Sequence, residues 1–300
     1  MKVFLTGATG YIGSAVAAAL LAQGHQVTGL ARHPEKAAAL VARGLRFVRG
    51  DLTNTVVLSE LAKEHDTVVH AGAARGQERG NIDIRAVDAL LAGARAGMAR
   101  RLLYTSGVWA LGATRDGPAD ETAPVRPHPL VAHRATVERR VLEASDGRLR
   151  TNVIRPGIVY GGREGILSMW WSAAMEGNHV RVVGDGDNRW PLVHREDLAQ
   201  LYLLVLEHGV PRGVYHGTDD TAYPVLRLAR HVAQAAGGLQ VQPWPLESAR
   251  LQFGLFADAL VMDQHVISPG ARALGWTLQH PDFPKEVDRL YDEFIALPRP

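Results

Sequence analysis

The feature that most constrains the fold of this chain is a set of three spaced glycines near its start. Residues 2–6 form an apolar run typical of a buried strand, and residues 11–23 carry the pattern of a helix. Gly7, Gly10 and Gly13 stand at intervals of three where one element passes into the other. Glycine at position 7 permits a tight turn out of the strand, and glycine at position 13 lets the helix pack closely against a sheet. The spacing therefore predicts a strand, a tight loop and a helix that begins beside that loop.

A loop of this kind predicts a phosphate site. The first turn of a helix has free N–H groups and the positive end of the helix dipole, and Gly10 lets a pyrophosphate approach the backbone. A second predicted strand at residues 26–30 completes the context that the motif needs. We therefore expect a dinucleotide cofactor at this loop. The residues expected to contact it are Gly7, Thr9, Gly10, Tyr11, Ile12 and Gly13.

The first half of the chain alternates strand-like and helix-like segments. Further strands are predicted at residues 45–48, 67–70, 101–105 and 150–155, and helices at residues 34–42, 56–62, 82–96 and 129–144. Such alternation gives right-handed βαβ units, and hence a parallel sheet covered by helices on both faces. After Gly161 the chain becomes richer in turns, with helices predicted at residues 196–207, 224–236 and 284–297. The fold class is therefore α/β, with a doubly wound parallel sheet.

The end of the second strand predicts which dinucleotide binds. The residues there are Leu30-Ala31-Arg32, so the acidic residue that would accept hydrogen bonds from an adenosine ribose is missing. Arg32 is placed to pair with a 2′-phosphate. This favours NADP(H), with NAD(H) as the alternative. The alternative is that Arg32 begins a loop and only faces solvent.

Residues after the next two strands complete the expected cofactor site. Asp51, followed by Leu52, can accept from the adenine amino group, or its carboxylate can close a turn. Ala71, Gly72 and Ala73 have small side chains, which let a ribose lie against the backbone.

Composition excludes several other classes of protein. The 300 residues include no cysteine, so disulfides, thiolate zinc sites and cysteine nucleophiles are absent. Lys and Arg number 33 against 31 Asp and Glu, and no predicted helix carries a basic stripe, so nucleic-acid binding is not expected. The His, Asp and Glu spacings predict no metal site. The start of the chain lacks a signal-peptide pattern, and no apolar run approaches the roughly 18 residues of a membrane helix. We expect a cytoplasmic chain without membrane contacts.

Several motifs in a fixed order give the chain a family resemblance. Besides the glycine loop they are Asp51-Leu52, Tyr104-Thr105-Ser106, the run Arg-Pro-Gly-Ile-Val-Tyr-Gly at 155–161 and Val-His-Arg-Glu-Asp-Leu at 193–198. Together they resemble the extended branch of the short-chain dehydrogenase/reductase superfamily, the NAD-dependent epimerase/dehydratase-like proteins. The resemblance implies a Rossmann domain, here residues 1–160 with some later segments returning to it. It also implies a smaller C-terminal α/β substrate-binding lobe, here mainly residues 161–300, with the site between the two.

The resemblance implies catalytic roles from which this chain partly departs. Family members place a Ser or Thr after the fifth strand to bond the substrate oxygen, and Ser106 matches it. They also carry Tyr-x-x-x-Lys on the next helix, where Lys lowers the Tyr pKa and holds the nicotinamide ribose. Leu130 and Arg134 stand at those positions. Leu130 has no proton to exchange, whereas Arg134 can hold a ribose or phosphate and supply positive charge. Pro156 is expected to shape the backbone beside the nicotinamide.

Four further residues are candidates for the missing proton and for substrate contacts. Tyr160 is the candidate acid, with packing as its alternative role, and His133 is expected on the surface of its helix. Arg189 resembles the residue that relatives with nucleotide-sugar substrates place on the diphosphate, with a rim position as the alternative. Trp109 is expected to line an apolar substrate pocket.

Three functions follow from these residues. The first is an NADP(H)-dependent oxidoreductase or epimerase-like enzyme that acts on a carbonyl or alcohol of a small molecule. The second is a redox sensor or scaffold that binds the dinucleotide without catalysis, which Leu130 and Arg134 favour. The third is a nucleotide-sugar epimerase or dehydratase. The expected partners are a small-molecule substrate and, through the helices at 82–96 and 129–144, a second copy of the chain in a homodimer.

Overall fold

A seven-stranded sheet forms the base of the molecule in this computed structural model, which describes residues 1–114, 117–177 and 179–297. Its strands in spatial order are β11 (Gly213–Gly217), β6 (Arg150–Pro156), β5 (Arg101–Thr105), β4 (Thr67–His70), β1 (Lys2–Thr6), β2 (Gln26–Ala31) and β3 (Arg46–Arg49). All neighbouring pairs are parallel. The chain builds outward from β1 in both directions, so the predicted doubly wound parallel sheet is confirmed. In such sheets ligands bind at the carboxyl ends of the strands where the order reverses, which is here between β1 and β4.

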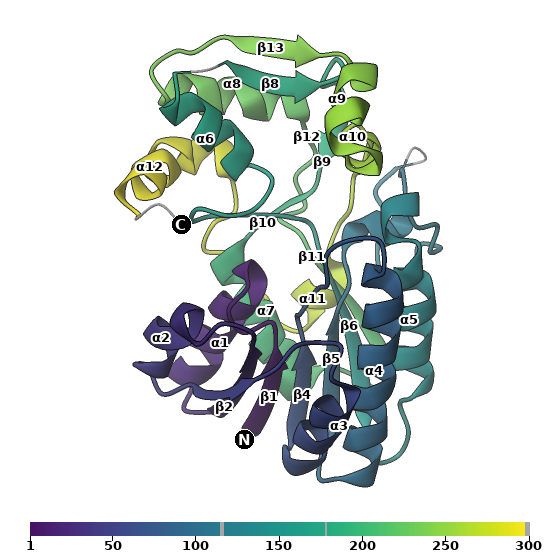
Figure 1. The fold of residues 1–300 in the computed structure, drawn as a ribbon. Coiled ribbons are helices and arrows are strands. Elements are labelled where there is room, and N and C mark those ends of the chain that lie inside the picture. The colour runs from purple at the N-terminus through teal and green to yellow at the C-terminus, as the bar shows by residue number, and fades with distance from the viewer. Residues whose placement is uncertain (115–116, 178, 298–300) are drawn as a thin grey trace.

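Helices cover both faces of this sheet (Figure 1). One face carries α1 (Tyr11–Ala22), α2 (Pro34–Val41), α7 (Arg195–His208) and α11 (Pro269–Ala273), and the other carries α3 (Thr55–Glu64), α4 (Arg79–Ala96) and α5 (His133–Glu143). Successive residues of β1 point to opposite sides, so Val3 and Leu5 join the core under α1 whereas Phe4 joins the core under α4. A strand buried on both faces needs apolar residues at every position, which explains the unbroken apolar run.

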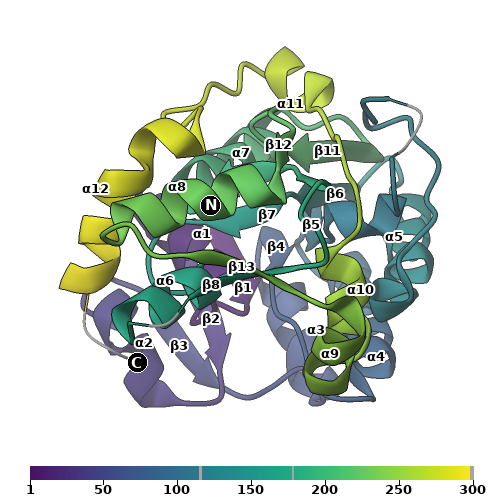
Figure 2. The same cartoon turned by 90° about the horizontal axis from the view of Figure 1, so that it is seen from above.

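A second group of elements lies beyond the carboxyl ends of the strands (Figure 1). It contains α6 (Ser168–Met175), β8 (Val180–Val183), α8 (Val225–Ala235), β13 (Val241–Trp244), α9 (Leu246–Phe253), α10 (Leu255–Leu260) and α12 (Phe283–Ala296). Three small two-stranded sheets accompany the large sheet. They pair β8 with β13, β7 (Ile158–Tyr160) with β10 (Leu192–His194), and β9 (Arg189–Trp190) with β12 (Tyr223–Pro224). Seen from above, α8 and the β8–β13 pair lie over the central strands (Figure 2). Since β11 and α7 also come from the second half of the chain, that half contributes to both groups.

The helix expected at 129–144 is present but begins later than predicted, which affects the site. Its α-helical part is α5, which begins at His133, and a short 3-10 turn, η2 (Pro129–Val131), precedes it. The backbone N–H groups of Leu130 and Val131 bond back to the side chain and the carbonyl of His128 instead of entering an α-helical ladder. Leu130 therefore precedes α5 rather than lying on it. Among the described helices, none has both the length and the apolar character that a bilayer crossing requires.

Candidate active site

The glycine loop lies at the predicted reversal point of the sheet. Gly7 has a φ of +73°, and a Cβ at this position would lie 2.6 Å from the Ala71 carbonyl oxygen. A Cβ at Gly13 would lie 2.0 Å from the Gly7 carbonyl oxygen, so any larger residue would separate α1 from the loop. Within the described chain no side chain caps the first turn of α1. Its N–H groups therefore stay open to an anion, as the sequence motif predicts.

Two adjoining cavities lie beside this loop. The loop cavity, of about 220 Å³, is lined by residues that include Ile12, 71–74, Tyr104, Leu130 and His133. The apolar cavity, of about 230 Å³, is lined by residues that include Tyr11, Val108, Trp109, Pro156 and Ile166. Ile12, Ser106, Val131 and Arg134 line both. The structure therefore brings most of the predicted cofactor and substrate residues to one place.

The other predicted cofactor residues lie around the same end of the sheet. Thr9 is half-buried in the loop, and Arg32 is exposed just beyond β2. Hydrogen bonds from the side chain and the backbone N–H of Thr53 lower the pKa of Asp51, and the charge of Arg32 lowers it further. One carboxylate oxygen of Asp51 accepts both Thr53 bonds, so this side chain closes a turn. Leu52 packs close to Gly72, where a Cβ would come within 3.2 Å of its side chain.

Arg134 is the charged side chain shared by the two cavities. It is half-buried in the first turn of α5, and its buried Nε has no hydrogen-bond partner in the described part of the chain. Its Nη1 lies 2.8 Å from the position of a Cβ on Gly107, so the guanidinium occupies the space beside this residue. No described carboxylate pairs with it, and its charge reaches Asp83 only at longer range. A partly buried cation without a partner favours an anionic or oxyanionic ligand.

Ser106 ends β5 with its hydroxyl already bonded. This side chain is 4 % exposed, and its Oγ donates to the carboxylate of Glu138. Glu138, itself buried, accepts from Arg155 at Nη2 over 2.7 Å and at Nε over 3.1 Å. The Ser106 proton therefore points at Glu138 rather than at a ligand. Contact between Ser106 and a substrate oxygen stays a prediction, and it requires Ser106 to act as an acceptor or to break this bond.

Asp83, on the buried face of α4, contacts three side chains at the wall of the loop cavity. His70 Nε2 lies 3.0 Å and His133 Nε2 lies 3.5 Å from its carboxylate oxygens, and Tyr104 donates to it over 2.6 Å. Burial by itself raises the pKa of Asp83, but the bonds from His70 and Tyr104 and the charge of Arg134 outweigh it, so the net shift is downward. Burial and the Asp83 charge raise the pKa of Tyr104. Asp83 is therefore a carboxylate at neutral pH, and Tyr104 keeps its proton.

His133 corrects the expectation of a surface side chain. Its side chain is only 17 % exposed, because the turn at η2 rotates the start of α5 so that the ring faces Asp83 and lines the loop cavity. Burial lowers the pKa of His133, and the attraction of Asp83 offsets this only in part. Leu130, as expected, brings no ionisable group to the cavity, and its carbonyl accepts from Arg79 over 2.9 Å.

Tyr160 does not lie where an acid for this site would have to lie. It lines neither the loop cavity nor the apolar cavity, and its ring packs edge-on against His194 and Phe283. Its hydroxyl donates to the His280 carbonyl over 3.1 Å, and burial raises its pKa. The prediction that Tyr160 supplies the proton therefore does not fit this placement. Its alternative role, packing, does.

Of the two other predicted substrate residues, Trp109 lies where the sequence predicts and Arg189 does not. Trp109, in the short helix η1 (Val108–Leu111), lines the apolar cavity as expected. Arg189 instead forms a two-bond ion pair with Asp263, with Nε–Oδ1 at 2.8 Å and Nη2–Oδ2 at 2.6 Å. This bond from Arg189 is the main cause of the lowered pKa of Asp263. Two of the three guanidinium nitrogens are thus engaged, which does not suit a diphosphate contact.

The residues present fit an NAD(P) cofactor. The glycine loop forms a cradle that any Cβ at position 7 or 13 would obstruct, and Arg134, whose buried Nε has no partner among the described residues, lines the loop cavity. For metals, one group of described residues places three ligand atoms within 4.8 Å of one another, namely His194, Glu196 and His280. His194 Nδ1 accepts from the Glu196 backbone and His280 Nδ1 bonds Glu286, whereas His194 Nε2 is buried without a hydrogen-bond partner among the described residues.

Comparison with known proteins decides the class of the chain. Residues 3–216 match the NAD dependent epimerase/dehydratase family. The chain belongs to this family. Membership confirms the resemblance expected from the motifs, and with it an NAD(P)-binding protein of the oxidoreductase or epimerase type. The NADP(H) preference is a finer statement that family membership leaves open.

Individual relatives agree with the family. An uncharacterized protein of Saccharomyces cerevisiae, YLL056C, is 33 % identical over 293 residues, which cover 93 % of this chain and 95 % of the relative. The 2-alkyl-3-oxoalkanoate reductase of Stenotrophomonas maltophilia is 28 % identical over 264 residues, covering 80 % and 77 %. Among solved structures, the human epimerase family protein SDR39U1 with NADPH has a TM-score of 0.82 at 21 % identity, and the match covers 98 % of this chain and all of that one. Its likeness concerns the fold.

Sequence reasoning missed three residues of the site, namely the buried acids Asp83 and Glu138, and Gly107. Asp83 has a visible signal, because it is an acidic residue on the apolar stripe of a predicted helix. Glu138 also has one, since it follows Arg134 by four residues and so lies on the same face of α5. Gly107 has none, because its importance comes from the guanidinium beside it.

Proposed function

We propose that this protein is an NADP(H)-dependent reductase of small apolar carbonyl compounds, in which Arg134 takes over the stabilisation of the substrate oxygen. The observation that carries the proposal is the guanidinium of Arg134, which lies unpartnered, as far as the described residues go, where the loop cavity meets the apolar cavity. The glycine loop supports the cofactor assignment, and the exposed Arg32 beyond β2 supports the choice of NADP(H). The reductase relative and the neighbour solved with NADPH are consistent with this direction of reaction.

Each step has a candidate group in this chain. The N–H groups of α1 and the loop bind the pyrophosphate, and the apolar cavity excludes water from the carbonyl carbon. NADPH, when bound, supplies the hydride. Arg134 donates hydrogen bonds to the carbonyl oxygen and stabilises the alkoxide that forms, which is the role of an oxyanion-hole donor. Leu130 has no proton and Tyr104 keeps its own, so we assign the proton that the alkoxide takes up to water in the loop cavity.

The test is NADPH oxidation with a panel of ketones, aldehydes and β-keto esters. Arg134→Gln should lower kcat about 10²–10³-fold, the usual cost of one oxyanion donor. The matched control is Arg139→Gln, which removes an exposed arginine from the same helix and should leave kcat unchanged. Since guanidinium stays charged across the range, kcat should be nearly constant between about pH 6 and 9. An Arg134→Gln enzyme as active as Arg139→Gln would contradict the proposal.

The redox sensor is the second candidate, because Leu130 removes the usual proton donor from the site. A sensor must bind the oxidised and reduced cofactors with different affinities. Calorimetric titration with NADP⁺ and NADPH distinguishes the two functions. Unequal affinities without turnover on any carbonyl would favour the sensor, and turnover that depends on Arg134 would favour the reductase.

A further inference from the structure

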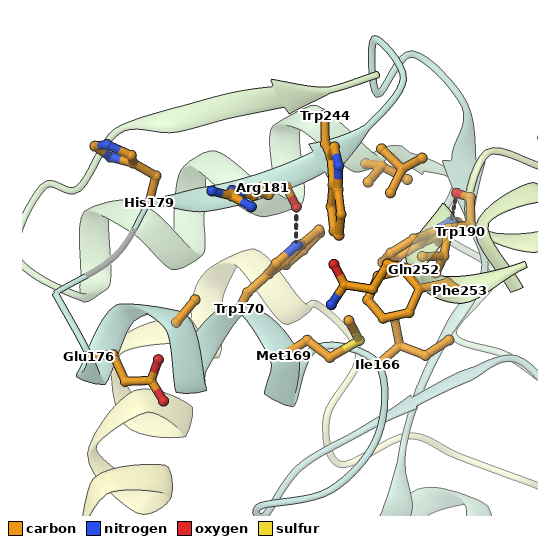
Figure 3. Close-up of a pocket in the computed structure, with 14 residues that line it drawn as sticks. Ile166, Met169, Trp170, Glu176, His179, Arg181, Trp190, Trp244, Gln252 and Phe253 are labelled. Atoms are coloured by element: carbon orange, nitrogen blue, oxygen red, sulfur yellow. Dashed lines mark hydrogen bonds between the residues drawn. The ribbon is translucent and has the colours of Figure 1, made fainter. Parts of the chain in front are cut away.

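A cavity in the second group of elements lies outside the site described above. This cavity, of about 410 Å³, opens between α6, β8, β13 and α9, and we call it the tryptophan cavity (Figure 3). Its walls include Ile166, Met169, Trp170, Trp190, Trp244 and Phe253. Neither the cofactor nor the carbonyl group of the proposed reaction needs it. The cavity is therefore free to bind another chemical group.

Two of the indoles on its walls, those of Trp170 and Trp190, have no need of a polar ligand. Trp170 and Trp190 are 7 % and 4 % exposed, and their rings stack with centroids 5.4 Å apart at 13°. Trp170 Nε1 donates to the Arg181 carbonyl over 2.8 Å, and Trp190 Nε1 donates to the Leu260 carbonyl over 3.0 Å. Both N–H groups are therefore satisfied by backbone, and the rings offer only faces and edges. Such a surface favours apolar and aromatic groups.

One end of the cavity is more apolar than the other. In Figure 3, Trp190, Phe253 and Ile166 lie together on one side, with Gln252 beside Phe253, whereas His179 and Glu176 lie on the other. A nucleobase at the apolar end would meet one side-chain amide, that of Gln252, and each of its remaining ring nitrogens and carbonyls left without a partner would cost about 1–3 kcal/mol. A hydrocarbon ring has no such groups. The volume also suffices, since an apolar cavity of about 150 Å³ holds benzene.

Ile166 connects this cavity to the site of reaction. It lines both the tryptophan cavity and the apolar cavity, at the junction just before α6. The two cavities are therefore neighbours on either side of Ile166, and a substrate that reaches both has to pass this side chain. Arg189, held by Asp263 through two of its nitrogens, presents no free pair of donors for a diphosphate.

We propose that the tryptophan cavity binds a fused or single hydrocarbon ring that belongs to the carbonyl substrate, so that the substrate class is aryl-bearing ketones rather than nucleotide sugars. This rests on the proposed reductase function for the carbonyl end alone. Binding of the ring in the tryptophan cavity does not depend on the proposed reduction of the carbonyl group.

Two probes separate these ends. The first is 2-acetylnaphthalene, which carries ring and carbonyl, compared with 2-butanone, which carries the carbonyl alone. The second is 2-methoxynaphthalene, which has the ring without a reducible group and is measured by equilibrium dialysis. Ala173→Trp fills the cavity from α6, and Ser172→Trp places the same side chain on the exposed side of that helix as the control. If Ala173→Trp does not fold, Met169→Asp, at a wall position that is 39 % exposed, replaces it.

We expect Ala173→Trp to weaken the binding of 2-methoxynaphthalene at least tenfold and to raise KM for 2-acetylnaphthalene by a similar factor. KM for 2-butanone should stay within twofold, and Ser172→Trp should match the wild type throughout. Equal binding of 2-methoxynaphthalene by the two variants would overturn the cavity assignment, even if ketones are reduced. The expected binding contrast without reduction of any ketone would uphold the cavity and refute the reductase.

Discussion

Arg134→Met should make the ligand-free protein more stable while it destroys activity. The buried Nε of Arg134 has no hydrogen-bond partner among the described residues, and an unsatisfied buried donor costs about 1–3 kcal/mol. Met fills similar space with no polar atom. The long-range attraction between Arg134 and Asp83 acts in the opposite direction, as the lowered pKa of Asp83 indicates. We therefore expect a net gain of about 1 kcal/mol in the free energy of unfolding, or roughly 2–4 °C in Tm for a chain of this size.

Arg155→Met is the matched control with the opposite sign. Arg155 is 3 % exposed and holds Glu138 through two of its nitrogens. Removal of one partner from a buried ion pair leaves the other charge uncompensated, which costs about 3–5 kcal/mol. Both substitutions replace Arg by Met. The difference between their effects on the free energy of unfolding therefore reports whether the arginine has a charged partner.

The assay is thermal unfolding of both variants with and without NADPH, together with NADPH oxidation on a reducible ketone. NADPH should raise the Tm of the wild type and of Arg134→Met by similar amounts, because the partner proposed for Arg134 is the substrate oxygen rather than the cofactor. Activity of Arg134→Met should fall about 10²–10³-fold. The reasoning is refuted if Arg134→Met loses as much stability as Arg155→Met, since Arg134 would then have a structural partner.

Three further outcomes are expected. Burial raises the pKa of Asp219 to about 7, so the folded state holds this proton more tightly than the unfolded chain, and stability should fall as pH rises from about 4 to 7, by at most roughly 4 kcal/mol. Thermal unfolding of Asp219→Asn across this range should lack that decrease, and a parallel pH profile would refute the assignment. Arg32→Ala should weaken NADPH binding by calorimetry about tenfold and leave NADH unchanged, whereas equal losses would argue against a 2′-phosphate contact. Asp263→Asn releases Arg189 and should let UDP raise Tm, a shift that the wild type should lack.

The local sequence was sufficient to predict the structure of segments whose geometry depends only on their own residues. The glycine loop needs φ of +73° at Gly7 and close contact at Gly13, and only glycine satisfies both, so the motif could be interpreted without the rest of the chain. The apolar run of β1 likewise predicts a strand with both faces covered. The turn at η2 was not predictable in the same way, because it depends on bonds to the His128 side chain and carbonyl.

The positions of functional side chains depended on contacts between distant segments. Tyr160 and Arg189 have the residue types that the chemistry needs, yet the His280 carbonyl holds one and Asp263 holds the other, from 120 and 74 residues away. Ser106 is bonded to Glu138 in the same manner. Short-range patterns carry no information about such partners, since any of these side chains is equally compatible with its own strand or helix.

The sequence by itself determined the α/β class, the positions of the parallel strands along the chain, the dinucleotide loop and the absence of a tyrosine at position 130. These follow from backbone sterics and hydrophobic periodicity, which act over a few residues. Only the tertiary structure decided that Arg134 lacks a partner among the described residues, that His133 faces Asp83, and that Trp170, Trp190, Trp244 and Phe253 line one cavity. These placements depend on which side chains from distant segments meet in the folded chain. The physical reason is that a buried side chain must find its hydrogen-bond partner and its space among the few groups packed around it.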